Sequence, residues 1–287
     1  MKEELLALLQ YGISKKRVRI FDLRENDFND LYPPVFFLST VRTGTKWFAD
    51  LFSKSKKTLV FHVPKPDLSV QGVFAYNLFE RGRLDKDEDL WQSIAEIFLA
   101  GREQHLRYSY KTEKQYIETN NFLTFFAPVL AKLFPHAKFV HIYRHPGEFV
   151  SSAINRNYYA DTDNNKMRRI KPVEGHYYDT WDNLSQLEKS AWLWNETNLF
   201  LEDFKSKINA DRVFSFNFNE LTLGNVKSLA QFIGVGLKEN TIRKNMQKKK
   251  NVQKKRKYPP YEKWGNQNKS QLKNICGNLA GKYGYRV

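Results

Sequence analysis

The sequence is short of cysteine: Cys276 is the only one among 287 residues. A single thiol cannot form an intramolecular disulfide, which excludes a disulfide-stapled secreted scaffold and favours a reducing compartment. No window reaches about 18 consecutive apolar residues, so no membrane span is expected. The opening stretch, MKEELLALLQYG, lacks the basic flank, the sustained apolar core and the small-residue cleavage site of a signal peptide. Together these absences predict a soluble, cytoplasmic protein.

Acidic residues are outnumbered by basic ones. Lys and Arg total 47 against 31 Asp and Glu, which gives a formal net charge of +16. An excess of this size predicts an anionic partner, such as nucleic acid, anionic lipid, or a phosphorylated or sulfated small molecule. Much of it falls in residues 243–257, RKNMQKKKNVQKKRK, which contain no acidic residue. That run is compatible with a solvated loop or with a loop that binds an anion.

Hydrophobic residues make up 41% of the chain and aromatic residues 15%, which is enough for a folded core. Apolar strand-like runs alternate with helical patterns, and this order predicts parallel strands, right-handed crossovers and a layered α/β fold. The expected strands are residues 35–40, 58–63, 114–119, 138–143 and 212–218. The expected helices are residues 45–54, 121–134, a segment from about 147, 183–207 as the longest, 225–235, and a C-terminal helix from about 270.

No internal repeat and no clean linker interrupts the sequence, so residues 1–287 are expected to form one domain. Its core is expected to cover about residues 33–285, after an N-terminal extension of residues 1–32. Residues 158–182 lack periodicity and are interpreted as a long loop, which in a compact domain is often a substrate lid. The basic run is expected to lie in a loop over residues 243–264.

The first chemical signal directly follows the strand expected at 35–40. Residues 40–47, TVRTGTKW, place a tight turn before a helix N-terminus, where free backbone N–H groups and the helix dipole favour an anion. Gly44 permits close approach of the backbone to a ligand, although a simple glycine turn is the alternative. The stretch is not a Walker A motif, which argues against an ordinary ATPase or GTPase. Hydroxyls and positive charges would come from Arg42, Thr43, Thr45 and Lys46.

The second signal follows the strand expected at 138–143, where the sequence continues RHPGEFVSS. Arg144 stands at the carboxyl end of a strand, the edge at which open α/β sheets bind ligands. Pro146 suits the first turn of the following helix. Ser152 would lie about two turns along that helix, so Arg144 and Ser152 could hold one phosphate together.

Together the two motifs resemble those of sulfotransferases that use 3′-phosphoadenosine 5′-phosphosulfate (PAPS). In that family the first loop holds the 5′-phosphosulfate and an RxPxxxxxS motif holds the 3′-phosphate. Residues 211–235 and 266–285 are similar to later segments of the family, so the resemblance spans about residues 35 to 285. It implies a three-layer, P-loop-NTPase-like sandwich that moves a sulfuryl group from PAPS to an acceptor hydroxyl without a metal ion. The basic residue in the first loop is Arg, which favours the carbohydrate-modifying or bacterial branches.

The resemblance also implies roles for individual residues. Arg42 would stabilise negative charge on the leaving phosphate as the S–O bond breaks. Trp47 would stack on adenine, although a tryptophan in the core is the alternative. Arg144 with Ser152 would bind the 3′-phosphate. The residues that would wrap the 5′ group are Thr43, Gly44, Thr45 and Lys46. A C-terminal loop that closes over the nucleotide is matched, at a spacing one residue longer, by Arg256, Lys257 and Trp264.

The sequence leaves the proton acceptor open. Cytosolic family members place a histidine where this chain has Asn120, so that histidine is missing here. His62, at the end of the second expected strand, is the first candidate, because a neutral imidazole near pH 7 suits a general base. Glu118 is the second candidate, and its alternative role is to orient Lys or Arg side chains. Other members of the family use a carboxylate just after the second strand.

The acceptor is expected to be a carbohydrate or another small molecule. The aromatic residues of 158–182 would suit stacking on a sugar ring or on a flat phenolic acceptor. One alternative is a kinase-like phosphotransferase, which would need Mg²⁺ ligands and a Walker A loop that the sequence does not clearly supply. The other is a non-catalytic protein that binds a nucleotide or, through residues 243–257, a polyanion; nucleic acid is the less favoured partner.

Overall fold

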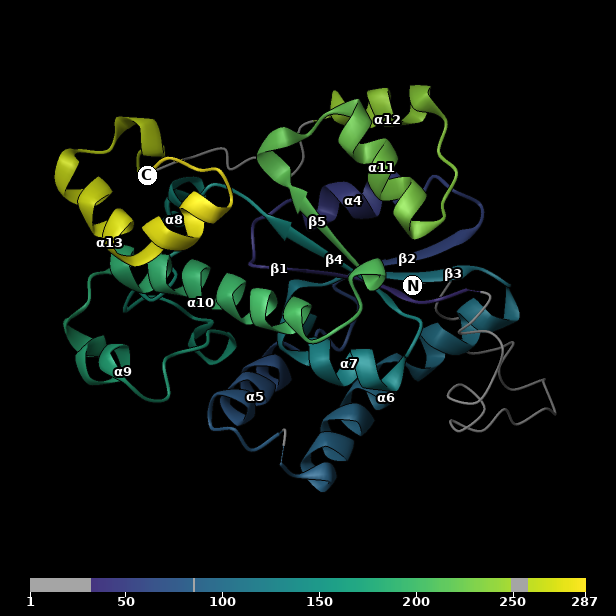
Figure 1. The fold of residues 1–287 in the computed structure, drawn as a ribbon, viewed down its shortest axis with the longest axis horizontal. Coiled ribbons are helices and arrows are strands. Elements are labelled where there is room, and N and C mark those ends of the chain that lie inside the picture. The colour runs from purple at the N-terminus through teal and green to yellow at the C-terminus, as the bar shows by residue number, and fades with distance from the viewer. Residues whose placement is uncertain (1–31, 85, 249–257) are drawn as a thin grey trace.

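The computed structural model describes residues 32–84, 86–248 and 258–287. Its centre is a five-stranded sheet with the strand order β2-β3-β1-β4-β5 (Figure 1). Every pairing between neighbouring strands is parallel. This confirms the predicted parallel sheet, and each expected strand is present to within one residue at each end. The strands are β1 (Val35–Ser39), β2 (Thr58–His62), β3 (Gln115–Thr119), β4 (Lys138–Tyr143) and β5 (Val213–Asn217).

Helices cover both faces of the sheet, which gives the three layers that the resemblance implies (Figure 1). One face is covered by α4 (Thr45–Phe52), α11 (Leu223–Ile233) and α12 (Glu239–Met246). The other is covered by α5 (Ser69–Glu80), α6 (Glu88–Lys111), α7 (Ala127–Leu133) and α10 (Gln186–Ser206). At one end of the sheet lie α8 (Pro146–Ile154) and α13 (Asn266–Lys282), both packed against α10.

The alternation of side chains along β1 explains the two cores. Phe36 and Leu38 point into the core beneath α5, α6, α7 and α10, whereas Val35 and Phe37 point into the core beneath α4, α11 and α12. Every residue of β1 is buried, as expected for a central strand that is covered on both faces. The chain moves from β1 to one side of the sheet for β2 and β3 and then to the other side for β4. The turn after β1 therefore lies at a topological switch point, where α/β sheets bind ligands.

The helices differ from the sequence expectation in several places. The longest helix in the described part of the chain is α6, with 24 residues against 21 for α10, and neither α5 nor α6 was expected. The helix α12 was not expected either, and it includes residues 243–246, so the loop expected over residues 243–264 is wrong at its start. The segment expected as one helix over 121–134 divides into a 3₁₀ turn, Asn121–Phe126, and α7. Pro128 stands in the first turn of α7, where its missing N–H leaves no backbone bond unmade, so it starts this helix rather than kinking it.

Residues 158–182 contain only short helical pieces: a 3₁₀ turn Lys166–Arg168, α9 (His176–Thr180) and a 3₁₀ turn Trp181–Asn183. The rings of Tyr158 and Trp181 are buried in the core beneath α10, and Tyr159 packs against it while donating a hydrogen bond to the Ile170 carbonyl. These rings are not exposed to stack on a sugar. Tyr178 is the large exposed aromatic of this segment.

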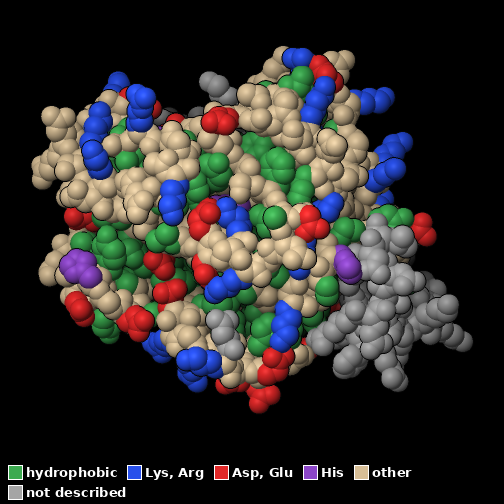
Figure 2. Space-filling model, viewed as in Figure 1, with side chains coloured by type: hydrophobic (Ala, Val, Ile, Leu, Met, Phe, Trp, Pro, Cys, Tyr) green, Lys and Arg blue, Asp and Glu red, His purple; other side chains and the backbone are tan. Residues whose placement is uncertain are grey.

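Charge is unevenly spread over the surface. Figure 2 shows Lys and Arg side chains gathered over α11 and α12, and several Asp and Glu side chains around α9 and α5. None of the helices in the described ranges is long and apolar enough to cross a membrane. Within the same ranges, no three His, Cys, Asp or Glu side chains are grouped in a way that could hold a metal ion.

Candidate active site

The turn after β1 depends on two positive backbone angles and one close contact. Arg42 has a φ of 69° and Gly44 a φ of 92°, both in the left-handed region. Gly44 caps α4, and a Cβ atom at this position would lie 2.2 Å from the Phe218 ring. Gly44 is therefore needed for its backbone angle and for the contact with Phe218. The turn leads straight into α4, whose first N–H groups lie at the carboxyl edge of the sheet.

The structure brings the two sequence motifs into direct contact. Arg144, just after β4, donates from Nη1 to the Arg42 carbonyl at 2.9 Å. Arg42 donates in turn from Nε to the Ser152 hydroxyl on α8 at 3.2 Å. Since β1 and β4 are paired neighbours, their carboxyl ends place these residues together although more than 100 positions separate them. Arg42, Arg144 and Ser152 thus form one cluster.

This cluster has the electrostatic character of an anion site. Burial lowers the pKa of the Arg42 guanidinium, and the positive charges of Arg156 and Arg144 lower it further. The buried Nε of Arg144 has no hydrogen-bond partner among the described residues. Clustered guanidinium groups and an unpaired buried donor are stabilised by a bound anion. A phosphate therefore fits the residues present.

Arg144 is held in place by a relay of side chains. It forms an ion pair with Glu148 on α8, and this pair outweighs the effect of burial and lowers the pKa of Glu148. Asn219, after β5, donates to the other Glu148 oxygen at 3.1 Å and accepts from the His145 N–H at 2.8 Å. The Tyr285 hydroxyl, near the chain end, donates to Asn217 and Asn219. The C-terminal residues thereby support the second motif.

Other residues expected to bind the nucleotide have different surroundings. The Thr43 hydroxyl donates to the Thr40 carbonyl at 2.9 Å and is fully buried, so it is not an outward donor. Thr45 is buried as well, and Lys46 is half-exposed in an ion pair with Asp50 at 2.7 Å. Lys46 would therefore interact with a bound ligand and with Asp50 at the same time.

Trp47 lies in the core between α4 and α12. Only 4% of it is exposed, and its indole N–H donates to the Asn245 carbonyl at 3.2 Å. The ring meets Phe48 edge to face. This placement leaves no open face of the Trp47 ring on which adenine could stack.

The two basic residues expected in a C-terminal nucleotide loop, Arg256 and Lys257, lie outside the described residues. Tyr258, which follows them, exchanges two hydrogen bonds with Asn155 at the end of α8, at 2.9 and 3.0 Å. Trp264 is 4% exposed and packs against Tyr258. The described chain therefore resumes beside the helix that carries Ser152.

Glu118 does not face an acceptor. It is fully buried, and its two oxygens accept from the Arg102 guanidinium at 2.8 to 3.0 Å. They also accept from the Tyr116 hydroxyl and the Asn120 amide. Its lone pairs are therefore occupied, which contradicts the role of general base and agrees with the alternative of orienting an arginine. Arg102, on α6, was missed because it lies in no motif and α6 itself was not expected.

His62 ends β2 and is half-buried, with Nδ1 3.0 Å from both the carbonyl oxygen and the hydroxyl of Thr119. Burial lowers its pKa, so the ring is neutral at pH 7. Val60, two residues earlier on β2, packs in the core beneath α4, so the His62 ring lies on the α4 side of the sheet. The charges of Lys46 and Asp50 on α4 also act on the pKa of His62. His62 is not among the residues that line the pocket described below.

Asp67, in the loop after β2, is a carboxylate that the sequence reasoning did not single out. It accepts from Lys65 Nζ at 2.6 Å and from the Ser69 hydroxyl at 2.7 Å. Arg168, from the 158–182 segment, lies 3.5 Å away. Partial burial acts to raise the pKa of Asp67, but the hydrogen bonds from Lys65 and Ser69 outweigh it and lower the pKa to about 2. The signal that could have identified it is its position directly after the second strand.

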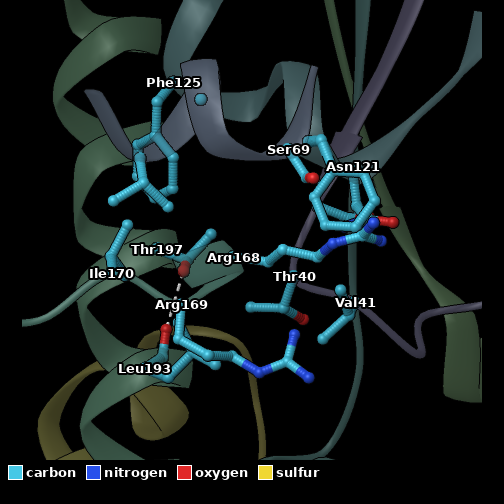
Figure 3. A pocket seen from close by; sticks show the side chains of 14 residues that line it. Thr40, Val41, Ser69, Asn121, Phe125, Arg168, Arg169, Ile170, Leu193 and Thr197 are labelled. Atoms are coloured by element: carbon cyan, nitrogen blue, oxygen red, sulfur yellow. Dashed lines mark hydrogen bonds between the residues drawn. The ribbon is translucent and has the colours of Figure 1, made fainter. Parts of the chain in front are cut away.

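A pocket opens beside the turn, between the end of β1, the start of α5, α10 and the 158–182 segment (Figure 3). Its volume is about 50 Å³, room for one small polar group. It lies on the opposite face of the sheet from α4. The lining residues are Ser39, Thr40, Val41, Ser69, Gly72, Val73, Asn121, Phe122, Phe125, Arg168, Arg169, Ile170, Leu193 and Thr197.

Solved structures with a similar fold are sulfotransferases. The chain is similar to sulfotransferase STF9 from Mycobacterium avium, at 11% identity and a TM-score of 0.50, over 94% of this chain and 83% of that one. The sulfotransferase domain from the curacin biosynthetic pathway matches at 12% identity and 0.49, over 90% and 99%. The sulfotransferase domain of the Synechococcus PCC 7002 olefin synthase matches at 14% and 0.48, over 88% and 95%. At 11% identity the likeness to STF9 bears on the fold alone. No curated protein matches the chain significantly.

The sequence of the central region carries the family assignment. Residues 33–239 match the profile of the sulfotransferase family, a stretch that begins just before β1 and ends at the start of α12. It includes the turn with Arg42 and Gly44 and the second motif with Arg144 and Ser152. With the parallel sheet and the contact between the two motifs, this match shows that the chain belongs to the sulfotransferase family.

Proposed function

We propose that this chain is a PAPS-dependent sulfotransferase. The observation that carries the proposal is the hydrogen-bonded cluster of Arg144, Arg42 and Ser152. In this proposal Arg144 and Ser152 bind the 3′-phosphate, and residues 42–46 bind the 5′ group at the start of α4. The unpaired Nε of Arg144 gives the 3′-phosphate a donor that no described protein group uses.

When bound, PAPS supplies a sulfuryl group for transfer to an acceptor hydroxyl, with release of adenosine 3′,5′-bisphosphate. Arg42 neutralises the charge that develops on the departing 5′-phosphate oxygen as its bond to sulfur breaks. Arg42 stays protonated at neutral pH despite its lowered pKa, because a guanidinium titrates far above neutrality. Fixed arginines stabilise this charge without reorganisation because the Arg144 relay and Ser152 already orient them.

The acceptor hydroxyl must lose its proton as the new O–S bond forms. In the proposal Asp67 takes that proton in place of His62. Asp67 is bonded to Ser69 and approaches Arg168, and both of these residues line the pocket, whereas the His62 ring is on the α4 side. A carboxylate is a weaker base than imidazole, but the pKa of Asp67, about 2, keeps it ionised at neutral pH.

The proposal is tested by calorimetric titration of adenosine 3′,5′-bisphosphate into the purified protein without added metal, with adenosine 5′-monophosphate as the comparison. We expect micromolar affinity for the bisphosphate and affinity at least about tenfold weaker for the monophosphate, since a charge-assisted bond is lost. Arg144→Ala should abolish this difference. Arg81→Ala, at the exposed C-terminal end of α5, is the matched control and should preserve it.

Equal binding of the two nucleotides, or no binding of either, would overturn the proposal. The favoured alternative would then be a polyanion-binding protein. Its affinity for the polyanion would fall steeply with salt and would not depend on Arg144. A nucleotide that binds only with Mg²⁺ would favour the kinase-like phosphotransferase instead.

A further inference from the structure

The pocket beside the turn restricts the acceptor to one chemical class, an inference that rests on the proposed function. Ser39, Thr40 and Val41 line the pocket and directly precede Arg42 in the chain. A ligand group bound in the pocket therefore lies next to the residues that lead from β1 into the turn with Arg42. Figure 3 shows the side chains of Arg168 and Arg169 extending beside Thr40 and Val41.

The pocket has a polar group that lacks a partner. The hydroxyl of Thr40 is buried, with 3% of the residue exposed. It has no hydrogen-bond partner among the described residues. A buried hydroxyl without a partner is destabilising, and a small polar group of a ligand would satisfy it. The pocket volume of about 50 Å³ gives room for such a group.

The walls of the pocket are apolar. Val73 comes from α5, Phe125 from the 3₁₀ turn after β3, and Leu193 from α10. Phe122 and Ile170 complete the apolar surface. A ring with hydroxyls on every carbon would leave most of them unpaired against such walls, so the pocket disfavours a sugar. It fits an aromatic or aliphatic skeleton.

The charged groups in the lining are all positive: it contains Arg168 and Arg169 and no Asp or Glu. Arg169 is engaged elsewhere, because it pairs with the buried Asp163 at 3.3 Å and stacks on Tyr158 at 3.4 Å. Arg168 is 40% exposed, and its carboxylate partner Asp67 is bonded more closely to Lys65. Arg168 thus shares one carboxylate with a second cation and can bind an anionic group.

We propose that the acceptor is a hydroxy acid: an apolar skeleton that carries the reacting hydroxyl and a carboxylate bound by Arg168. The hydroxyl oxygen forms the new bond to sulfur, the bond between sulfur and the 5′-phosphate oxygen breaks, and the hydroxyl proton passes to Asp67. The carboxylate of the acceptor is unchanged by the reaction and serves only in recognition.

The test is a panel of matched acceptors assayed with PAPS. Hydroxyphenylpropionate and hydroxydecanoate are each compared with their methyl esters, which keep the hydroxyl and the skeleton but lose the charge; glucose and glucuronate form the sugar pair. We expect kcat/KM for the acids to exceed that for the esters by roughly ten- to hundredfold, as expected for a charge-assisted hydrogen bond. Arg168→Gln should bring the ratio close to one by raising KM, and Arg168→Lys should restore part of it.

Arg81→Gln removes a positive charge at the far end of α5 from the pocket and should leave the ratio unchanged. Esters used as well as acids, a preference for either sugar, or failure of every hydroxy acid to react would each overturn the inference. Calorimetry with adenosine 3′,5′-bisphosphate on the same Arg168→Gln preparation keeps the two proposals apart. If the nucleotide still binds, a negative result in the acceptor panel contradicts the inferred acceptor and not the proposed function.

Discussion

Two carboxylates near the site, Glu118 and Asp67, are the same chemical group in opposite situations. Glu118 is buried beneath the sheet edge with every oxygen bonded, and it fixes Arg102, which also donates to the Pro66 carbonyl at 2.8 Å. Glu118 therefore braces the loop that carries Asp67. Asp67 lies at the rim, bonded to Ser69 and close to Arg168. Glu118 therefore has a structural role, whereas Asp67 lies where the proposed function needs a proton acceptor. Burial and hydrogen-bond partners account for this difference.

The pH profile separates Asp67 from His62 as proton acceptor. The pKa of Asp67 is about 2, so the carboxylate is ionised throughout the working range and kcat/KM should stay flat from about pH 8 down to about pH 5. If His62 were the base, kcat/KM would fall on the acid side as the ring is protonated, at a pH below 6.5 because burial lowers its pKa. Asp67→Asn should reduce kcat by about a hundredfold or more, and His62→Asn should have a much smaller effect.

The measurement uses the acceptor with the highest kcat/KM in the panel above. An acid limb in the wild type that disappears in His62→Asn would refute the assignment to Asp67. Circular dichroism of Asp67→Asn is the accompanying control, since Asp67 also anchors the start of α5 by accepting from the Ser69 N–H at 3.1 Å.

At the scale of elements, the start of α4 packs against the segment after β5, and this packing shapes the turn with Arg42 and Gly44. Phe218 begins that segment and lies directly over Gly44, the cap of α4. Its ring, which has no hydroxyl, fills the space over Gly44. The contact fixes where α4 begins relative to β5, and with it the direction of the N–H groups that face the ligand.

Gly44→Ala tests this packing. The added Cβ meets the Phe218 ring at 2.2 Å and a φ of 92° disfavours any side chain, so the turn must shift. We expect affinity for adenosine 3′,5′-bisphosphate to fall by more than about tenfold in calorimetry, since several backbone donors move together. Gly281→Ala is the control, because a Cβ there, in α13, has open space around it and should leave affinity unchanged. Unaltered affinity in Gly44→Ala would mean that the turn does not contact the nucleotide.

At the scale of the whole molecule, the site is assembled from distant parts of the chain. Residues from the ends of β1, β4 and β5, from α8 and from the chain's C-terminal end meet within one hydrogen-bonded network. The His145 ring lies against both Tyr261 and Tyr285, so the C-terminal region packs on the second motif. The network explains how a small number of contacts can hold Arg144 at a set angle.

Asn219→Ala tests whether this network positions Arg144. Losing the bonds to Glu148 and His145 should weaken binding of adenosine 3′,5′-bisphosphate by roughly five- to tenfold, the value of one or two hydrogen bonds. Binding of adenosine 5′-monophosphate should change little, because in the proposed function Arg144 binds the 3′-phosphate, which this nucleotide lacks. Asn225→Ala removes an exposed asparagine bond at the start of α11 and serves as the control. Equal weakening of both nucleotides would indicate a general structural effect.

The periodicity of the sequence was enough to predict the strands and the parallel sheet, because buried central strands are continuous apolar runs. It was not enough for α5 and α6, which carry apolar residues such as Phe74 and Tyr110 on exposed faces and so blur the helical pattern. That Arg144 and Ser152 lie at the same end of the sheet could be anticipated because both lie in one short segment. The bonds of Arg144 and Ser152 to Arg42 depend on β1 and β4 being neighbours.

Local features can therefore be predicted from the sequence. The glycine turn, the helix that starts after it, and the strand that precedes Arg144 all follow from neighbouring residues. What each side chain faces follows only from folding. Trp47 became a core residue, Glu118 became the partner of Arg102, and Asp67 and Arg168 were brought within 3.5 Å across about 100 residues of chain. The physical reason is that burial and pairing depend on which strands and helices become neighbours, and those contacts arise between segments far apart in the sequence.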